Sequence, residues 1–335
     1  MKKSLFPKFI SILLLICASG WIGYAFYTRN VHYRETRFLF DTEVYIEAHG
    51  WEAKQAGLQV LDRMGDLDAK LNKFKAGSEL DKINQAAGQQ PVEVSDLTFE
   101  VIAQSLQIAE TTGGAFDPTV GPLMALWGFG SQEKQTVPSN KEISEYLKLV
   151  GYQKVILDQA NKTVYLTRKG MMLDLGAIAK GYAVDQAVQI LKEHNISSAL
   201  VSAGGNIYTI GRRTNGSPWQ IGIRDPASKE KIVGYIQLEN QAIDTSGDYE
   251  RFFWANGKKY SHIIDPRTGY PAQGVSGCTV IMPQAAQADA FATAAFVLGV
   301  DKGLDLIEED NSPGVMIDSQ GQMVLSSKMK ELLIK

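Results

Sequence analysis

The stretch Leu173-Asp-Leu-Gly-Ala-Ile-Ala-Lys-Gly-Tyr-Ala-Val-Asp185 brings a carboxylate, a glycine turn and a lysine together at the start of a helix. Its first residues predict the end of a buried strand, Gly176 permits a tight turn, and residues 178–191 carry apolar side chains at helical spacing. Free N–H groups at the helix start would then lie beside Asp174 and Lys180, which suits a phosphate or a cation that bridges phosphates. The alternative is a plain helix start, in which Asp174 caps the helix and Lys180 is solvated.

The composition is that of a globular protein with a substantial core. The chain has 335 residues, 44% of them hydrophobic, and a formal net charge of −3. Without long basic runs, this charge argues against binding to nucleic acid, which normally requires a concentrated positive surface. Its two cysteines are Cys17 and Cys278. Because Cys17 lies in the N-terminal apolar run, the rest of the chain has no partner for an internal disulfide.

The N-terminus has the pattern of a membrane anchor or an export signal. Residues 1–8 are basic, and residues 9–27 are uncharged over roughly the length that crosses a bilayer as a helix. The apolar run continues past a possible cleavage site at Ala18-Ser19-Gly20, which favours an uncleaved anchor. Lipidation at Cys17 is a further alternative. The leading lysines predict a cytoplasmic start, with the catalytic body in residues 36–335 outside the cytoplasm.

The remaining pattern predicts an α+β fold with mainly antiparallel sheets, because most strands follow one another through short turns. Strands are expected at residues 37–48, 155–167 (a hairpin), 199–211 (a pair broken by Gly204 and Gly205), 219–224, 231–238, 241–244, 257–265 and 275–282, and near residues 314 and 322. Helices are expected at residues 51–73, 96–112, 178–191 and 285–298, and near residues 301–308. Residues 113–130 form a loop rich in glycine, proline and aromatic side chains.

Three segments carry residues suited to chemistry. Asp289 and Thr293 are four apart on an alanine-rich helix, so both project from one face, and a carboxylate with a hydroxyl is a suitable pair for Mg²⁺. His262 could act as a general base because histidine titrates near neutrality. The turn at residues 245–251 combines hydroxyls, an aromatic ring and a cation, which would suit a phosphate or a flat ring. Each also has a purely structural explanation: a solvated helix face, a hydrogen-bonded histidine at a strand end, and a plain turn.

Several separated motifs together resemble the ApbE family of FAD:protein FMN transferases, in order and in rough spacing. They are Gly113-Gly-Ala-Phe-Asp-Pro-Thr-Val-Gly-Pro-Leu123, Leu126-Trp-Gly-Phe-Gly130, Asp174-Leu-Gly-Ala-Ile-Ala-Lys-Gly-Tyr-Ala-Val-Asp185, Gly204-Gly205-Asn206, Thr245-Ser-Gly-Asp-Tyr249, Ser261-His-Ile-Ile-Asp-Pro-Arg-Thr-Gly269 and Ala288-Asp-Ala-Phe-Ala-Thr-Ala294. The resemblance runs from about Phe38 to near the C-terminus. It implies an ApbE-like, T-fold-related domain.

The resemblance also implies an activity and a site. The activity is Mg²⁺-dependent transfer of FMN from FAD to a threonine hydroxyl of an acceptor protein, with release of AMP. The implied metal ligands are the carbonyl of Ala177 and the side chains of Asp289 and Thr293, and His262 matches the histidine associated with transfer. The implied FAD contacts are Phe40, Phe74, Ala115, Phe116, Asp117, Asp174, Lys180 and Ile264.

Two positions depart from the family pattern, and both fall in the implied flavin pocket. Phe40-Asp41-Thr42 stands where many members have Met-Gly-Thr, and Phe74 stands where many have tyrosine. The implied partner is a threonine-containing flavoprotein acceptor, exported or membrane-bound, and the implied place is a bacterial cell membrane with the catalytic domain outside the cytoplasm. Two alternatives remain: an FAD pyrophosphatase that gives FMN and AMP, and an exported protein that only binds FAD.

Overall fold

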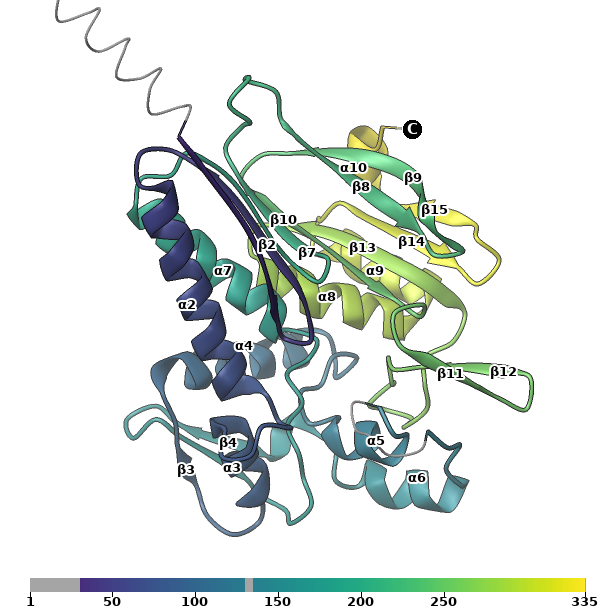
Figure 1. Ribbon diagram of the computed structural model, residues 1–335. Helices are drawn as coiled ribbons and strands as arrows, with labels where there is room; N and C mark the ends of the chain where they lie inside the picture. Colours follow the sequence, from purple (N-terminus) through teal and green to yellow (C-terminus); the bar gives the residue numbers. More distant parts are fainter. Residues whose placement is uncertain (1–30, 130–134, 335) are drawn as a thin grey trace, which may run out of the picture.

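A large antiparallel sheet organises the fold in the computed structural model, which describes residues 31–129 and 135–334. Neighbouring strands pair antiparallel throughout this sheet (Figure 1). In sheet order the strands are β1 (His32–Leu39), β2 (Thr42–His49), β6 (Ser198–Ala203), β7 (Asn206–Ile210), β10 (Gln241–Gly247), β13 (Val275–Met282), β14 (Gly314–Asp318) and β15 (Met323–Leu325).

Helices cover one face of the sheet (Figure 1). They are α2 (Ala53–Leu71), α7 (Ala179–Glu193), α8 (Ala285–Leu298) and α9 (Val300–Glu309), with α4 (Asp96–Thr111) packed behind α2 and α8. Side chains alternate along each strand, so Val44 and Ile46 of β2 and Ala242 of β10 enter this helix-side core. Helix α8 is buried nearly all round, since its alanines allow close approach to both α7 and the sheet.

A hairpin covers the other face of the sheet at β10, β13 and β14. It consists of β8 (Trp219–Asp225) and β9 (Ser228–Leu238), with α10 (Ser327–Leu332) beside it. Ile236, Ile243, Ile281 and Met329 are among the residues of this second core. The central strands are therefore buried on both faces, and a polar side chain that points inward from them needs a partner or a function.

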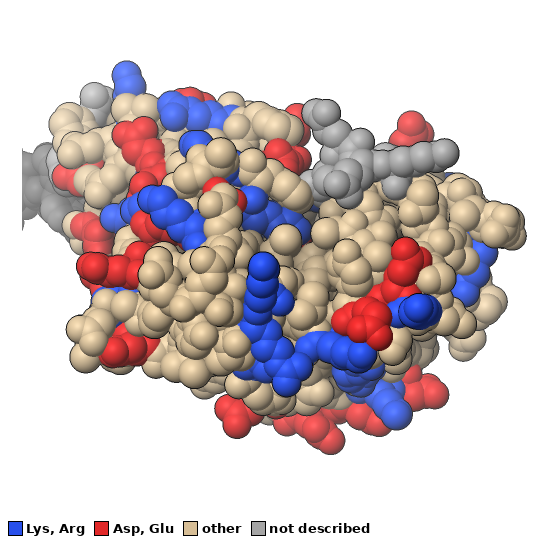
Figure 2. Space-filling model, turned by 90° about the horizontal axis from the view of Figure 1, so that it is seen from below, with Lys and Arg blue, Asp and Glu red and all other residues tan. Residues whose placement is uncertain are grey.

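The remaining elements form a lobe below the sheet in Figure 1, which we call the lower lobe. It contains α3 (Glu79–Gln85), the small sheet of β3 (Val92–Glu93), β5 (Thr163–Leu166) and β4 (Val155–Asp158), the helices α5 (Gly121–Leu126) and α6 (Asn140–Leu147), the 3₁₀ turn η1 (Tyr152–Lys154) and the hairpin of β11 (Phe252–Ala255) and β12 (Lys258–Ser261). The rings of Trp127 and Phe129 pack at a tilt against the ring of Phe253 of this hairpin. Seen from below, lysine and arginine side chains are interspersed with acidic ones (Figure 2).

The long periodic segments of the sequence are confirmed as elements. The helices expected at residues 51–73, 96–112 and 285–298 are α2, α4 and α8, and the hairpin expected at residues 155–167 is β4 with β5. The pair broken at Gly204 and Gly205 is β6 with β7. The anchor predicted at residues 9–27 lies outside the described residues, and in the described ranges no helix is long and apolar enough to cross a membrane.

Four expectations were wrong in detail. The single strand expected at residues 37–48 is a hairpin, because Phe40 and Asp41 take φ of 54° and 57° and reverse the chain between β1 and β2. The strand end expected at Leu173 is a buried extended segment outside any sheet, tied by the Asp174 N–H to the Pro118 carbonyl at 2.7 Å. The strand expected at residues 257–265 ends at Ser261, and its partner β11 was not expected. The loop at residues 113–130 contains α5.

Candidate active site

A cavity of about 450 Å³ lies where the lower end of the large sheet meets α7, α8 and the lower lobe. Every residue that the sequence implied for FAD, for the metal or for transfer lines this cavity. These residues are Phe40, Phe74, Ala115, Phe116, Asp117, Asp174, Ala177, Lys180, His262, Ile264, Asp289 and Thr293. Their roles stay predictions, but the fold brings together side chains from segments that are far apart in the sequence.

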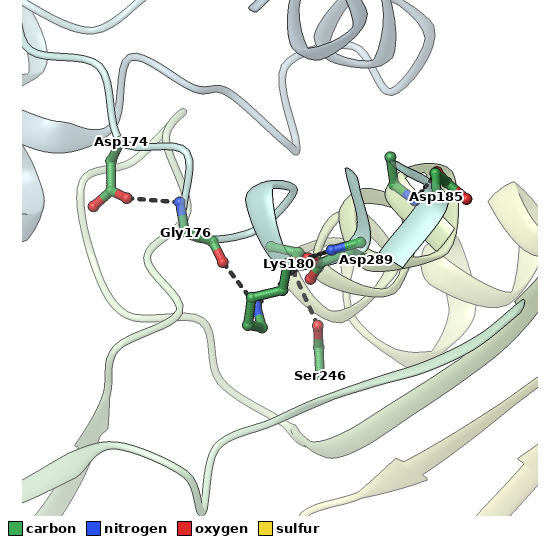
Figure 3. A network of polar contacts seen from close by, with 9 residues as sticks. Asp174, Gly176, Lys180, Asp185, Ser246 and Asp289 are labelled. Atoms are coloured by element: carbon green, nitrogen blue, oxygen red, sulfur yellow. Dashed lines mark hydrogen bonds and ion pairs between the residues drawn. The ribbon is translucent and has the colours of Figure 1, made fainter. Parts of the chain in front are cut away.

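The glycine turn before α7 connects Asp174 to Lys180 (Figure 3). Asp174 Oδ1 accepts a hydrogen bond from the Gly176 N–H at 2.9 Å, and Lys180 Nζ donates to the Gly176 carbonyl at 2.9 Å. Helix α7 begins only after its N-cap residue Ile178, so Asp174 does not cap it. Lys180 also lies 3.4 Å from Asp289 Oδ2, which rules out the alternative in which this lysine is simply solvated.

Buried polar contacts fix α8 against α7, and we call this pair of helix starts the α7–α8 corner. Asp289, only 3% exposed, accepts from the Gly181 N–H at 3.1 Å. Asp185 of α7 accepts from the N–H groups of Ala285 and Ala286 at 2.7 and 2.9 Å, which satisfies the start of α8. Burial raises the pKa of Asp185 to about 6, against these two hydrogen bonds. These short hydrogen bonds hold α7 and α8 in a fixed position relative to each other.

A second carboxylate, Asp244 of β10, faces the same corner and was missed by the sequence reasoning. Asp244 is 3% exposed, and burial and then the charge of Asp289 raise its pKa. Two residues further along β10, Ser246 Oγ lies 3.0 Å from Thr293 Oγ1. The signal that could have found Asp244 is a lone acid in the apolar strand Ala242-Ile243-Asp244, which alternation turns toward the helices.

His262 and Arg251 lie at the base of the β11–β12 hairpin, and both line the cavity. His262 Nδ1 is 3.2 Å from the Arg251 carbonyl oxygen. A carbonyl can only accept a hydrogen bond, so Nδ1 carries the proton and Nε2 keeps its lone pair. Burial, and then the Arg251 guanidinium, lower the pKa of His262 to about 4. The imidazole is therefore neutral at pH 7 and able to accept a proton.

Asp174 has a partner that the sequence reasoning missed. Lys73 Nζ lies 2.5 Å from Asp174 Oδ2 and 4.8 Å from the centre of the Phe74 ring. Burial of Asp174 raises its pKa, but the Lys73 ammonium, the Gly176 N–H and the Arg251 charge together outweigh burial and lower the pKa. Phe74 itself is 54% exposed at the rim of the cavity. The pair places a cation beside a flat ring at the position where flavin contacts were implied.

The side chain of Asp117 serves the loop in which it lies. Its Oδ1 accepts from the Thr119 N–H at 2.8 Å and the Thr119 hydroxyl at 2.6 Å, and its Oδ2 accepts from the Tyr152 N–H at 2.9 Å. Burial nevertheless raises its pKa. These bonds use most of its acceptor capacity, so the predicted contact of Asp117 with FAD would run mainly through its backbone.

The donors around Asp289 fit a hard cation such as Mg²⁺. Asp289 offers a carboxylate, Thr293 a hydroxyl, and Ala177, whose side chain has no donor, only its carbonyl oxygen. In the part of the chain that the structure describes, no group of three His, Cys, Asp or Glu side chains forms a metal cage. The donors that are present, one carboxylate, one hydroxyl and one carbonyl, suit Mg²⁺, because Mg²⁺ usually takes one or two carboxylates and keeps water or substrate phosphates as its other ligands.

Comparison with known proteins shows the family to which the chain belongs. The sequence profile of the ApbE family matches residues 40–317. This chain belongs to the ApbE family. The FAD:protein FMN transferase of Haemophilus influenzae is 37% identical over 253 residues, 73% of each chain. The FAD:protein FMN transferase of Treponema pallidum is 35% identical over 335 residues, 94% of this chain and 91% of that one.

Solved structures of ApbE proteins share the fold. The ApbE protein of Thermotoga maritima superimposes with a TM-score of 0.85 at 37% identity, covering 91% of this chain and all of that one (100%). The flavin transferase ApbE of Vibrio cholerae superimposes with a TM-score of 0.82 at 29% identity, covering 90% and 99%. The predicted α+β class with mainly antiparallel sheets is confirmed as the ApbE fold.

Proposed function

We propose that this protein transfers FMN from FAD to a threonine hydroxyl of an acceptor protein and releases AMP. Relatives that match most of the chain are named FAD:protein FMN transferases. The observation that carries the proposal is that a neutral histidine, a corner with a carboxylate and a lysine, and an aromatic rim line the same cavity. Transfer needs all three: a base for the hydroxyl, charge balance for the phosphates and a binding surface for the flavin.

The reaction joins the threonine Oγ to the phosphorus of the FMN half of FAD. The pyrophosphate bond breaks, and AMP leaves with the bridging oxygen. His262 Nε2 takes the threonine proton, because Nδ1 already donates to the Arg251 carbonyl and Nε2 keeps its lone pair. Lys180 supplies positive charge beside the phosphates, and the Gly176 carbonyl keeps its ammonium in place.

A Mg²⁺ ion would be held by Asp289, Thr293 and the carbonyl of Ala177, and when bound it neutralises phosphoryl charge. Arg251 and Lys73 also line the cavity, where they offer further positive charge to the phosphates or to the flavin. At the rim, the rings of Phe74 and Phe40 provide the flat surface on which an isoalloxazine ring can stack.

The acceptor in this proposal is an exported or membrane-bound redox protein with an accessible threonine. Support comes from the sequence: the basic residues 1–8 and the uncharged residues 9–27 have the pattern of an anchor that leaves the catalytic domain outside the cytoplasm. The described domain begins with β1 at His32, at the end of the sheet that lies away from the lower lobe (Figure 1). An anchor before β1 would thus join the domain at the end away from the lower lobe.

A product analysis tests the function. The full chain is incubated with FAD and Mg²⁺, with and without a flavoprotein domain that carries the acceptor threonine, and AMP and covalently bound flavin are quantified. The expected result is one covalent FMN per AMP, and none on an acceptor with its threonine changed to valine. AMP without covalent flavin would indicate an FAD pyrophosphatase, and retained FAD without AMP would indicate a binding protein.

A further inference from the structure

Asn206 is a buried amide whose oxygen has no partner. It begins β7 directly after Gly204 and Gly205, is 1% exposed and lines the cavity. Its Oδ1 has no hydrogen-bond partner among the described residues. A buried acceptor without a donor costs roughly 1–3 kcal/mol, so its presence in a cavity wall points to a donor that comes with a ligand.

Asp244 lies beside Asn206 on the neighbouring strand. The register pairs Ile207 with Ile243, which places Asn206 and Asp244 next in line on β7 and β10. Side chains alternate, and the next residues of the same phase, Tyr208 and Ala242, belong to the helix-side core. Both polar side chains therefore point to the α7–α8 corner. Asp244 accepts from the Thr245 N–H, which uses only part of the acceptor capacity of its carboxylate.

The unused acceptors around this pair suit a hydrated cation. Asp244 and Asp289 are buried carboxylates, and Lys180, 3.4 Å from Asp289, is the ammonium that faces them. The free groups are acceptors: Asn206 Oδ1, the remaining oxygen sites of Asp244 and those of Asp289. Ser246, in phase with Asp244 on β10, contacts Thr293 at 3.0 Å, so Asp244 lies next to the Mg²⁺ ligands of the proposed function.

We propose that Asn206 and Asp244 accept hydrogen bonds from the water molecules that the divalent cation keeps, and so hold the hydrated ion against Asp289 and Thr293. This inference rests on the metal site of the proposed function. Mg²⁺ gives up water reluctantly, and each bound water has two protons that need acceptors. Both residues are positioning residues, which act on the ion through its water.

Cation binding to the full-length protein tests the proposal without FAD or an acceptor. Free Mn²⁺ is followed by its electron paramagnetic resonance signal, and Mg²⁺ competition gives the affinity for Mg²⁺. We expect Asp244→Asn and Asn206→Leu each to weaken binding by about 10- to 100-fold. Asn206→Asp, which adds a carboxylate at the same place, should tighten binding. If Asn206 had a purely structural role, Asn206→Leu and Asn206→Asp would not change the Mn²⁺ affinity in opposite directions.

Matched controls come from the same strands. Thr209→Val removes another buried oxygen on β7 that lacks a partner among the described residues, but outside the cavity. Glu239→Gln removes an exposed carboxylate that precedes β10 and pairs with Arg212 at 2.8 Å. Both should bind Mn²⁺ as the unaltered chain does. Melting temperatures show whether a loss of binding reflects unfolding. If Asn206→Leu unfolds, the affinity of Asn206→Asp still tests the proposal.

Either of two binding results would overturn the proposal: an unaltered chain that binds no Mn²⁺ at millimolar concentration, or folded Asp244→Asn and Asn206→Leu variants with undiminished affinity. A third result would do the same. If spin-echo measurement in deuterated water shows more metal-bound water in Asp244→Asn than in the unaltered chain, Asp244 is a direct ligand. If the expected affinities are found while FMN transfer to a threonine acceptor is absent, the positioning role stands and the transferase function fails.

Discussion

The two walls of the cavity are built in different ways. On the α7–α8 corner, Asp289 accepts from the backbone N–H of Gly181, and Asp185 holds the start of α8, so the groups suited to phosphate chemistry are buried and fixed. The other wall carries Phe40, half-buried in a tight turn, and Phe74, which is 54% exposed. Both departures from the family pattern fall on this exposed wall. The difference indicates that packing holds the groups suited to phosphate chemistry in place, while the residues of the implied flavin contacts can vary.

The largest effect on transfer is expected from His262, which lies at the base of the hairpin between the two walls. His262→Ala removes the proton acceptor and should lower the rate of FMN transfer by about 10²- to 10⁴-fold. FAD affinity should change little, since neither wall is altered. Single-turnover transfer and FAD titration measure the two separately. Transfer at the unaltered rate would remove His262 from the mechanism.

The next effect breaks the corner itself. A Cβ on Gly181 would lie 2.3 Å from the Ala285 carbonyl oxygen, so Gly181→Ala should push α7 from α8 and destabilise the fold by about 1–3 kcal/mol. The Gly181 N–H would also move away from Asp289, and transfer should fall with it. The matched control is Gly65→Ala on α2, where a Cβ meets nothing within 4 Å and the expected change is a gain of about 0.5–1 kcal/mol. Urea unfolding compares the two, and equal stabilities would contradict the tight corner.

The pH dependence of transfer tests the environment of His262. Because its pKa is lowered to about 4, the ring is neutral above pH 5 and this group causes no loss of rate between pH 5 and 8. The rate should fall about tenfold per pH unit only once the pH drops below about 4. Arg251→Gln removes one cause of the lowered pKa, so the acid limb should move to higher pH. An acid limb near 6.5 in the unaltered chain, the ordinary pKa of histidine, would contradict this environment.

The smallest effect is expected on the exposed wall. Phe74→Tyr keeps the aromatic ring and adds a hydroxyl that can stay in water, because Phe74 is 54% exposed. The KM for FAD should therefore change by about twofold or less, with kcat unchanged. Phe74→Leu removes the ring and should raise KM further. A large drop in kcat for either variant would show that this wall takes part in the transfer step, and the two walls would then not differ in function.

The sequence predicts best where one signal acts alone. Helix α8 has the expected bounds, since an alanine-rich run that ends at Gly299 leaves no competing structure. The hairpin turn at Phe40 and Asp41 escaped prediction because non-glycine residues at positive φ are uncommon, and although aspartate often occurs in turns, phenylalanine does not. There the tertiary fold overrides the local pattern.

The sequence predicted those residues of the candidate site that lie in short, contiguous motifs. The motif residues, from Asp174 and Lys180 to Asp289 and Thr293, were found in the sequence. Lys73 and Asp244 were not, because their importance depends on partners more than 40 residues away, Asp174 and Asp289. A charged side chain becomes informative only when the fold shows what it faces.

The most direct test of the central claim is the intact mass of an acceptor domain that is co-expressed with this protein. The unaltered chain and the charge control Glu239→Gln should both add the mass of one FMN phosphodiester to the acceptor. Asp289→Asn, which removes the buried carboxylate of the corner, should add none. No mass gain with the unaltered chain, or a full gain with Asp289→Asn, would contradict the account.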